Sequence, residues 1–148
     1  MTSKICFDTN ILIYSIDIRD PDKHLVAERV VGACSDMASP VALQALGEFF
    51  SAVTRKGLLP SPEAAQIVNT LREASNVIPA IEDDLPAAIE IHQRYGFQFF
   101  DCLLAATYIR SGCTTLLSED FQHTQTIFAL TVLNPFRMTE QELGFLLQ

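Results

Sequence analysis

The sequence lacks the glycine motifs that identify several common enzyme classes. It contains no G-x-x-x-x-G-K-[ST] loop, no G-x-G-x-x-G turn and no G-x-S-x-G turn. The first two bind nucleotide phosphates, and the third carries the nucleophilic serine of many hydrolases. These absences disfavour the usual nucleotide-binding sites and a serine-hydrolase site.

Closely spaced cysteines and histidines are also missing. The four cysteines form no C-x-x-C pair, and each is surrounded by apolar residues: Cys6, Cys34, Cys102 and Cys113. This pattern predicts buried free thiols, disfavours a zinc site, and fits a reducing cytoplasm.

The chain has no long uninterrupted apolar run and no basic stretch leading into one. A transmembrane helix needs about 20 consecutive apolar residues, and a signal peptide needs a basic start followed by an apolar segment. We therefore expect no membrane association and no secretion.

Positive charge is scarce, because 10 Lys and Arg residues face 18 Asp and Glu residues, for a formal net charge of −8. This sign opposes binding to a phosphate backbone. A nucleic-acid substrate would need bound divalent metal, a second subunit or a local basic rim. Candidates for such a rim are Arg55, Lys56, Arg72, Arg94 and Arg110, although solvated helix faces are the simpler explanation of these residues.

The 148 residues, 49% of them hydrophobic, predict one ordered domain spanning residues 1–148. Short apolar strands alternate with segments of helical periodicity. This order predicts a three-layer α/β/α fold with a central, mostly parallel sheet of four to five strands. Strands are expected at 5–7, 41–43, 77–81, 114–117 and 129–133, and helices at 10–16, 23–37, 44–56, 62–71, 85–95, 97–109 and from 139 onward.

Acidic side chains recur where these elements begin and end. Asp8 follows the first strand, Glu119 and Asp120 follow the fourth, and Asp101 opens an almost wholly apolar helix. The carboxyl ends of parallel strands share one edge of a sheet, and Glu48 lies on a helix leaving that edge. Asp101 could instead cap its helix, and Glu48 could be a solvated residue.

Several carboxylates in one pocket repel each other unless protons or cations neutralise them. A ligand set made only of oxygen suits Mg²⁺ or Mn²⁺. Such ions can activate water and stabilise both oxygens in the hydrolysis of a phosphodiester. Thr9, Asn10 and Ser118 are candidates to orient ligands or phosphate, although turn and cap roles explain them equally well. Asp83 and Asp84 are expected to pair with a helix dipole.

Five motifs occur in a specific order along the chain. They are Phe-Asp-Thr-Asn-Ile-Leu from residue 7, Leu-Gly-Glu-Phe from 46, Phe-Asp-Cys-Leu-Leu-Ala-Ala from 100, Leu-Leu-Ser-Glu-Asp-Phe-Gln-His from 116, and Asn-Pro-Phe from 134. With these motifs the sequence resembles the PIN-domain ribonucleases, and among them the VapC-type toxins. The resemblance covers nearly the whole chain.

The resemblance implies a metal-dependent endoribonuclease, the toxin of a toxin-antitoxin pair. It implies that Asp8, Glu48, Asp101 and Asp120 are the catalytic, metal-binding acids. Asp8 and Asp101 are expected to bind Mg²⁺ or Mn²⁺ directly, and Glu48 and Asp120 directly or through water; alignment favours Asp120 over Glu119. It also implies an RNA substrate, a homodimer, and a cognate antitoxin that occludes the site.

Two other classes of function remain open on the residues alone. The −8 charge fits a catalytically silent module whose acidic pocket binds a basic protein partner. A receiver-like or phosphatase domain phosphorylated on Asp8 is a weaker alternative, because the second Asp and the Lys expected there are not seen at matching positions.

Overall fold

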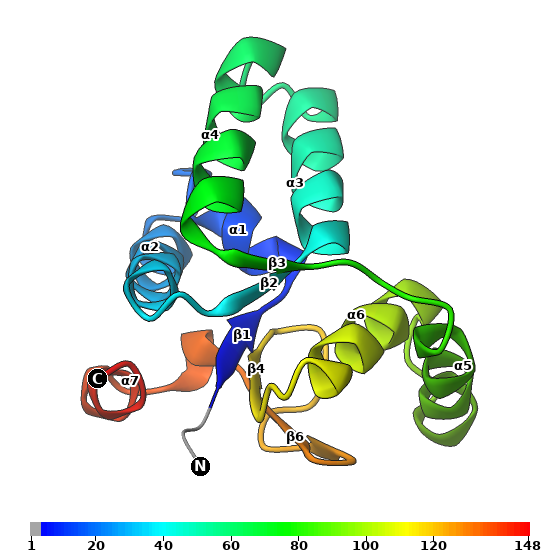
Figure 1. The fold of residues 1–148 in the computed structure, drawn as a ribbon. Helices are drawn as coiled ribbons and strands as arrows, with labels where there is room; N and C mark the ends of the chain where they lie inside the picture. Colours follow the sequence, from blue (N-terminus) through cyan, green and yellow to red (C-terminus); the bar gives the residue numbers. More distant parts are fainter. Residues whose placement is uncertain (1–3) are drawn as a thin grey trace.

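The computed structural model describes residues 4–148 and consists of short strands alternating with helices (Figure 1). The strands are β1 (Ile5–Phe7), β2 (Pro40–Ala42), β3 (Asn76–Ile78), β4 (Thr115–Leu117), β5 (Thr126–Ile127) and β6 (Leu130–Leu133). The helices are α1 (Thr9–Tyr14), α2 (Pro21–Asp36), α3 (Leu43–Arg55), α4 (Ser61–Ala74), α5 (Asp84–Tyr95), α6 (Phe99–Arg110), the 3₁₀ turn η1 (Pro135–Arg137) and α7 (Glu140–Leu146).

The central sheet has four strands in the order β1-β4-β6-β5. β4 pairs in parallel with both β1 and β6, so that Leu116 lies opposite Cys6 on one side and Val132 on the other. Only β5, among the strands of this sheet, runs antiparallel to its neighbour. The predicted α/β fold with a mostly parallel central sheet is therefore confirmed. β5 itself was not predicted, because two residues are too few to show a period.

β2 and β3 do not join this sheet, and instead form a separate two-stranded parallel sheet. The strands expected at 41–43 and 77–81 are therefore present within about one residue at their starts, but they lie outside the central sheet. The buried Tyr108 hydroxyl lies between β1 and β2, where it donates to the Phe7 carbonyl at 2.7 Å and accepts from the Ala42 N–H at 3.1 Å. The Tyr108 side chain thus links β1 to β2, which share no backbone hydrogen-bond pairing of their own.

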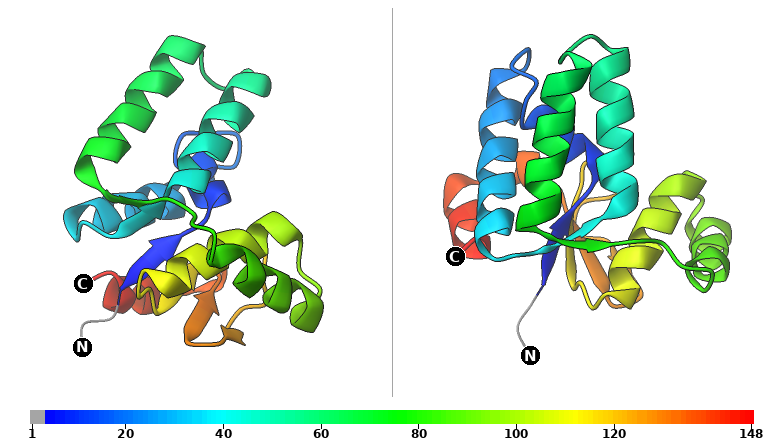
Figure 2. Two further views of the ribbon diagram at one scale, coloured as in Figure 1. Left: turned by 45° about the vertical axis from the view of Figure 1, so that its right-hand side comes forward. Right: turned by 45° about the horizontal axis from the view of Figure 1, so that its top comes forward.

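Helices flank the central sheet on two sides, and a helical hairpin projects from it. α2 lies on one side of β1 and the α5–α6 pair on the other, while α3 and α4 rise from the small β2–β3 sheet (Figures 1 and 2). The most deeply buried large side chains come from both the sheet and these helices: Phe7, Ile11, Leu12, Leu46, Phe49, Ile91, Leu104, Tyr108, Leu116, Leu117, Ile127 and Leu130. One core therefore holds the elements together.

An ion pair joins α5 to α6. Asp84 is 2% exposed, and its carboxylate accepts from Arg110 Nε at 2.8 Å, Arg110 Nη2 at 3.1 Å, Thr107 Oγ1 at 3.1 Å and the Ile81 N–H at 2.9 Å. Burial alone would raise the pKa of Asp84, but the bonds from Arg110, Ile81 and Thr107 outweigh it and hold the pKa below its usual value. Asp84 is thus more than a dipole partner, and Arg110 is occupied in the structure.

Helix ends follow the local sequence. Gly96 ends α5 in the left-handed conformation, with φ of 76°. Thr139 and Glu142 form a reciprocal capping box at the start of α7, in the helix expected from residue 139 onward. Between residues 4 and 148, no helix combines the length and apolar character required to cross a membrane.

Candidate active site

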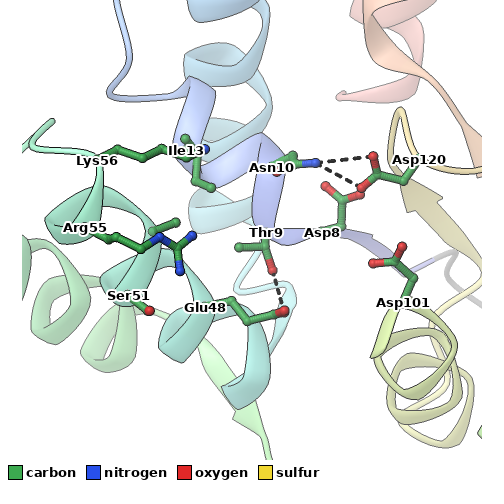
Figure 3. A pocket seen from close by; sticks show the side chains of 11 residues that line it. Asp8, Thr9, Asn10, Ile13, Glu48, Ser51, Arg55, Lys56, Asp101 and Asp120 are labelled. Atoms are coloured by element: carbon green, nitrogen blue, oxygen red, sulfur yellow. Dashed lines mark hydrogen bonds between the residues drawn. The ribbon is translucent and has the colours of Figure 1, made fainter. Parts of the chain in front are cut away.

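All four predicted acids line one cavity of about 300 Å³ at the end of β1 (Figure 3). They reach it from four separate segments: Asp8 from the end of β1, Glu48 from α3, Asp101 from α6, and Asp120 from the loop after β4. The remaining lining residues are Thr9, Asn10, Ile13, Ser51, Ala52, Arg55 and Lys56.

Asp8 is held at the junction between strand and helix. It is 3% exposed, and its Oδ1 accepts from the Ile11 N–H at 3.3 Å, which makes it the N-cap of α1. Thr9 or Asn10 was expected in that role. Burial raises the pKa of Asp8 well above its usual value; the Asp120 and Asp101 charges add to this, while bonds from Ser118 and Ile11 oppose it.

Ser118 connects Asp8 to the loop that carries Asp120. It is fully buried, its hydroxyl donates to Asp8 Oδ2, and its Oγ accepts from the Asp120 N–H at 3.0 Å. The structure therefore shows both roles considered for Ser118: its hydroxyl orients the Asp8 carboxylate, and it also closes the turn that leads to Asp120.

Asp120 and its neighbour Glu119 point in different directions. Asn10 Nδ2 donates to both Asp120 oxygens, at 3.0 and 3.3 Å, and Asp120 lies across from Asp8 in Figure 3. Burial and the Glu119 charge raise the pKa of Asp120, against bonds involving Asp8 and Asn10 that lower it. Glu119 does not line the cavity and instead binds two residues outside it.

The partners of Glu119 are Tyr14 and Lys23. The Tyr14 hydroxyl donates to Glu119 Oε1 at 2.8 Å, and Lys23 Nζ lies 2.7 Å from Glu119 Oε2. Lys23 also lies over the rings of Tyr14 and Phe136. This network fixes the turn before Asp120 to α1 and α2, and it was not visible in the sequence because its members are far apart in the chain.

Asp101 lies in the first turn of α6, and the helix is capped by another residue. Gln98 Oε1 accepts from the Asp101 N–H at 3.1 Å, so the Asp101 carboxylate is free to face the cavity. Burial, followed by the charges of Asp120 and Glu48, raises its pKa to about 6. Asp101 therefore lies in the first turn and does not cap the helix, which was the alternative that the sequence left open for it.

Glu48 lies across Thr9 from the three aspartates (Figure 3). Its Oε1 accepts from Thr9 Oγ1 at 3.0 Å and from Gln44 Nε2 at 3.2 Å. Gln44 Nε2 also donates to the Phe100 carbonyl at 2.8 Å, which links α3 to the residue before Asp101. Glu48 is an exposed residue at the edge of the cavity, where Thr9 and Gln44 are its defined hydrogen-bond partners.

Two cations, Arg55 and Lys56, form the opposite wall of the cavity together with Ser51 (Figure 3). All three are exposed and come from the last turn of α3 and the residue after it. Of the five basic residues considered for a rim, these two line the cavity, and Arg72, Arg94 and Arg110 do not.

The donor chemistry of the acidic wall suits a hard cation. The lining acids offer oxygen ligands only, and burial and mutual repulsion raise the pKa of Asp8, Asp101 and Asp120. In the part of the chain that the structure describes, no three His, Cys, Asp or Glu side chains are already arranged to hold a metal ion. The ligand types therefore fit Mg²⁺ or Mn²⁺, while their spacing is not that of a closed metal site.

The chain belongs to the PIN domain family, which matches residues 5–128. Two solved structures share its fold. VapC20 of Mycobacterium tuberculosis, a toxin described as cleaving the sarcin-ricin loop, is 20% identical over 79% of this chain and 92% of its own, with a TM-score of 0.61. A toxin-antitoxin complex from Klebsiella pneumoniae is 17% identical over 91% of this chain and 100% of its own, with a TM-score of 0.62. Comparison with curated proteins found no match.

Proposed function

We propose that the protein is a metal-dependent endoribonuclease that hydrolyses RNA phosphodiester bonds. The observation that carries this proposal is the convergence of Asp8, Glu48, Asp101 and Asp120 on one cavity from four chain segments. Membership of the PIN domain family and the sarcin-ricin loop cleavage by a protein of the same fold support RNA as the substrate.

Asp8 and Asp101 are the proposed direct ligands of Mg²⁺ or Mn²⁺, and Glu48 and Asp120 complete the site directly or through water. The bound ion would supply a Lewis acid that lowers the pKa of water and neutralises charge on the phosphate. Ser118 and Asn10 orient Asp8 and Asp120 through the hydrogen bonds described above. Thr9 holds Glu48 in the same way.

The test is cleavage of RNA by the purified protein with Mg²⁺ or Mn²⁺, compared with EDTA. Asp8→Asn and Asp101→Asn should each lower the rate by about 100-fold or more, because the loss of one ligand weakens metal binding and charge stabilisation. Asp36→Asn is the matched control, since Asp36 is exposed at the end of α2 and lies outside the cavity. Full activity in EDTA, or in both site variants, would overturn the proposal.

We further propose that the protein acts in the cytoplasm as the toxin of a toxin-antitoxin pair, and forms a homodimer. The similarity to a toxin-antitoxin complex supports an antitoxin partner. A basic antitoxin side chain such as Arg would pair with the carboxylates of the cavity. Co-expression with the product of an adjacent short reading frame should relieve growth arrest, and a sustained arrest would refute the toxin-antitoxin proposal. Light scattering should give the mass of two chains, and the mass of one chain would refute the homodimer.

A further inference from the structure

The cavity has two walls of opposite charge. The acidic wall carries Asp8, Asp101 and Asp120, and the opposite wall carries Arg55 and Lys56 (Figure 3). A cation wall has no use in holding a metal ion, which it would repel. Its presence in a chain of net charge −8 therefore calls for a second, anionic ligand in the same cavity.

Arg55 and Lys56 are available to such a ligand. Three other cations, Arg19, Lys23 and Arg110, are held in ion pairs with Asp17, Glu119 and Asp84. Neither Arg55 nor Lys56 takes part in the ion pairs that residues 4–148 form. Lys56 does lower the pKa of Asp17 through its charge, after the larger effects of Arg19. Both side chains are exposed on the cavity wall.

We propose that Arg55 and Lys56 bind backbone phosphates of the RNA next to the scissile one, so that a strand crosses the cavity from the basic wall to the acidic wall. This inference rests on the proposed ribonuclease function. A guanidinium can bind phosphate through two parallel hydrogen bonds, and an ammonium binds it as a point charge. Contacts of this kind position the strand without reading its sequence.

Binding is measured in an Asp8→Asn background, in which labelled RNA stays intact. The probe is a fluorescein-labelled single-stranded RNA, followed by fluorescence anisotropy at several salt concentrations. Arg55→Gln/Lys56→Gln should raise Kd about tenfold and should lower the slope of log Kd against log salt by about 0.7 for each phosphate that the protein no longer neutralises.

The control is Arg72→Gln/Arg94→Gln, which removes the same charge from residues outside the cavity. It should change Kd by less than about twofold, because distant exposed charges are screened by salt. If both double variants weaken RNA binding equally, the effect comes from net charge alone and the inference is overturned. Unchanged binding by the Arg55 and Lys56 variant, or no measurable RNA binding by the Asp8→Asn protein, would also overturn it.

Cleavage kinetics provide a second readout in the otherwise unmodified protein. Loss of Arg55 and Lys56 should raise KM about tenfold and change kcat by less than about threefold, because the contacts hold substrate and transition state equally. Arg55→Lys, which keeps the charge, should restore part of the affinity. If the unmodified protein cleaves no RNA, the proposed function fails, while the anisotropy comparison still decides the role of the basic wall.

Discussion

The Ser118 hydroxyl donates a hydrogen bond to the Asp8 carboxylate, and both groups are buried. The same oxygen accepts from the Asp120 N–H, so one serine sets the relative positions of two acids that lie more than a hundred residues apart in the chain. Partners that orient a ligating carboxylate are often nearly as important as the ligand itself.

Replacement of Ser118 by Ala should lower metal affinity and activity by about 10- to 100-fold, because Asp8 loses its donor and the Asp120 turn loses its acceptor. Mg²⁺ titrations of the cleavage rate measure this effect. Ser111→Ala is a matched control, since its hydroxyl donates to the Tyr108 carbonyl at 2.8 Å outside the cavity. An unchanged Mg²⁺ dependence for Ser118→Ala would refute the role.

Asp120→Asn should lower activity but not stability, whereas Glu119→Gln should lower stability but not activity. Asp120→Asn should reduce cleavage about 100-fold without loss of stability, because it removes a repelled carboxylate from the cavity. Glu119→Gln weakens its pairing with Tyr14 and Lys23, and should cost about 1 kcal/mol in the free energy of unfolding with little change in kcat. Activity losses of the same size in both variants would make Glu119 a part of the site.

Asp101→Asn should stabilise the metal-free protein. In EDTA at about pH 8 the carboxylate is charged, and its raised pKa shows that burial and the nearby Asp120 and Glu48 charges oppose that state. We expect a gain of about 1 kcal/mol and a rise in Tm of about 2–4 °C.

In saturating Mg²⁺ the unsubstituted protein should instead have the higher Tm, because metal binding stabilises it more than the Asp101→Asn variant. Thermal denaturation with and without EDTA measures both effects, and Asp36→Asn should change neither Tm by as much. A lower Tm for Asp101→Asn in EDTA would contradict the prediction.

The Asp84–Arg110 pair predicts a pH dependence of stability. The pKa of Asp84 is lower in the folded protein than in the unfolded chain, so its contribution is complete above the unfolded value of about 3.9 and is lost as pH falls through the folded value. Asp84→Asn should cost about 2 kcal/mol at pH 7, a value reduced from that of a fully buried pair because the Arg110 side chain is 33% exposed.

Urea denaturation at two pH values tests this prediction. The difference between Asp84→Asn and the unsubstituted protein should be largest near neutral pH and should shrink as the pH falls through the lowered folded-state pKa of Asp84. A difference that does not vary with pH would assign the effect to packing and not to charge.

The acids of the cavity could be predicted from the sequence because local signals place them. Asp8 and Asp120 follow apolar strands, and parallel strands bring their carboxyl ends to one edge. Glu48 and Asp101 were harder, since each could equally be a surface or capping residue. Their order within the motifs, more than their spacing, indicated the common site.

Other features depended on side chains from distant parts of the chain. No local pattern shows that Tyr108 joins Phe7 to Ala42, or that β2 lies outside the central sheet. Glu119 likewise lies outside the cavity, where it binds Tyr14 and Lys23, about a hundred residues away in the chain. Periodicity reports which face of an element is buried, and not which polar group it meets there.

Asp8 caps α1 as well as facing the cavity, and this double role constrains how the protein can evolve. A descendant that lost the proposed activity would still need an acceptor for the Ile11 N–H, worth about 1 kcal/mol to the fold. Asp, Asn, Ser or Thr would therefore persist at this position after catalysis had disappeared, whereas the cavity's other acids would be free to change. In inactive relatives, a capping residue here marks helix stability and not surviving activity.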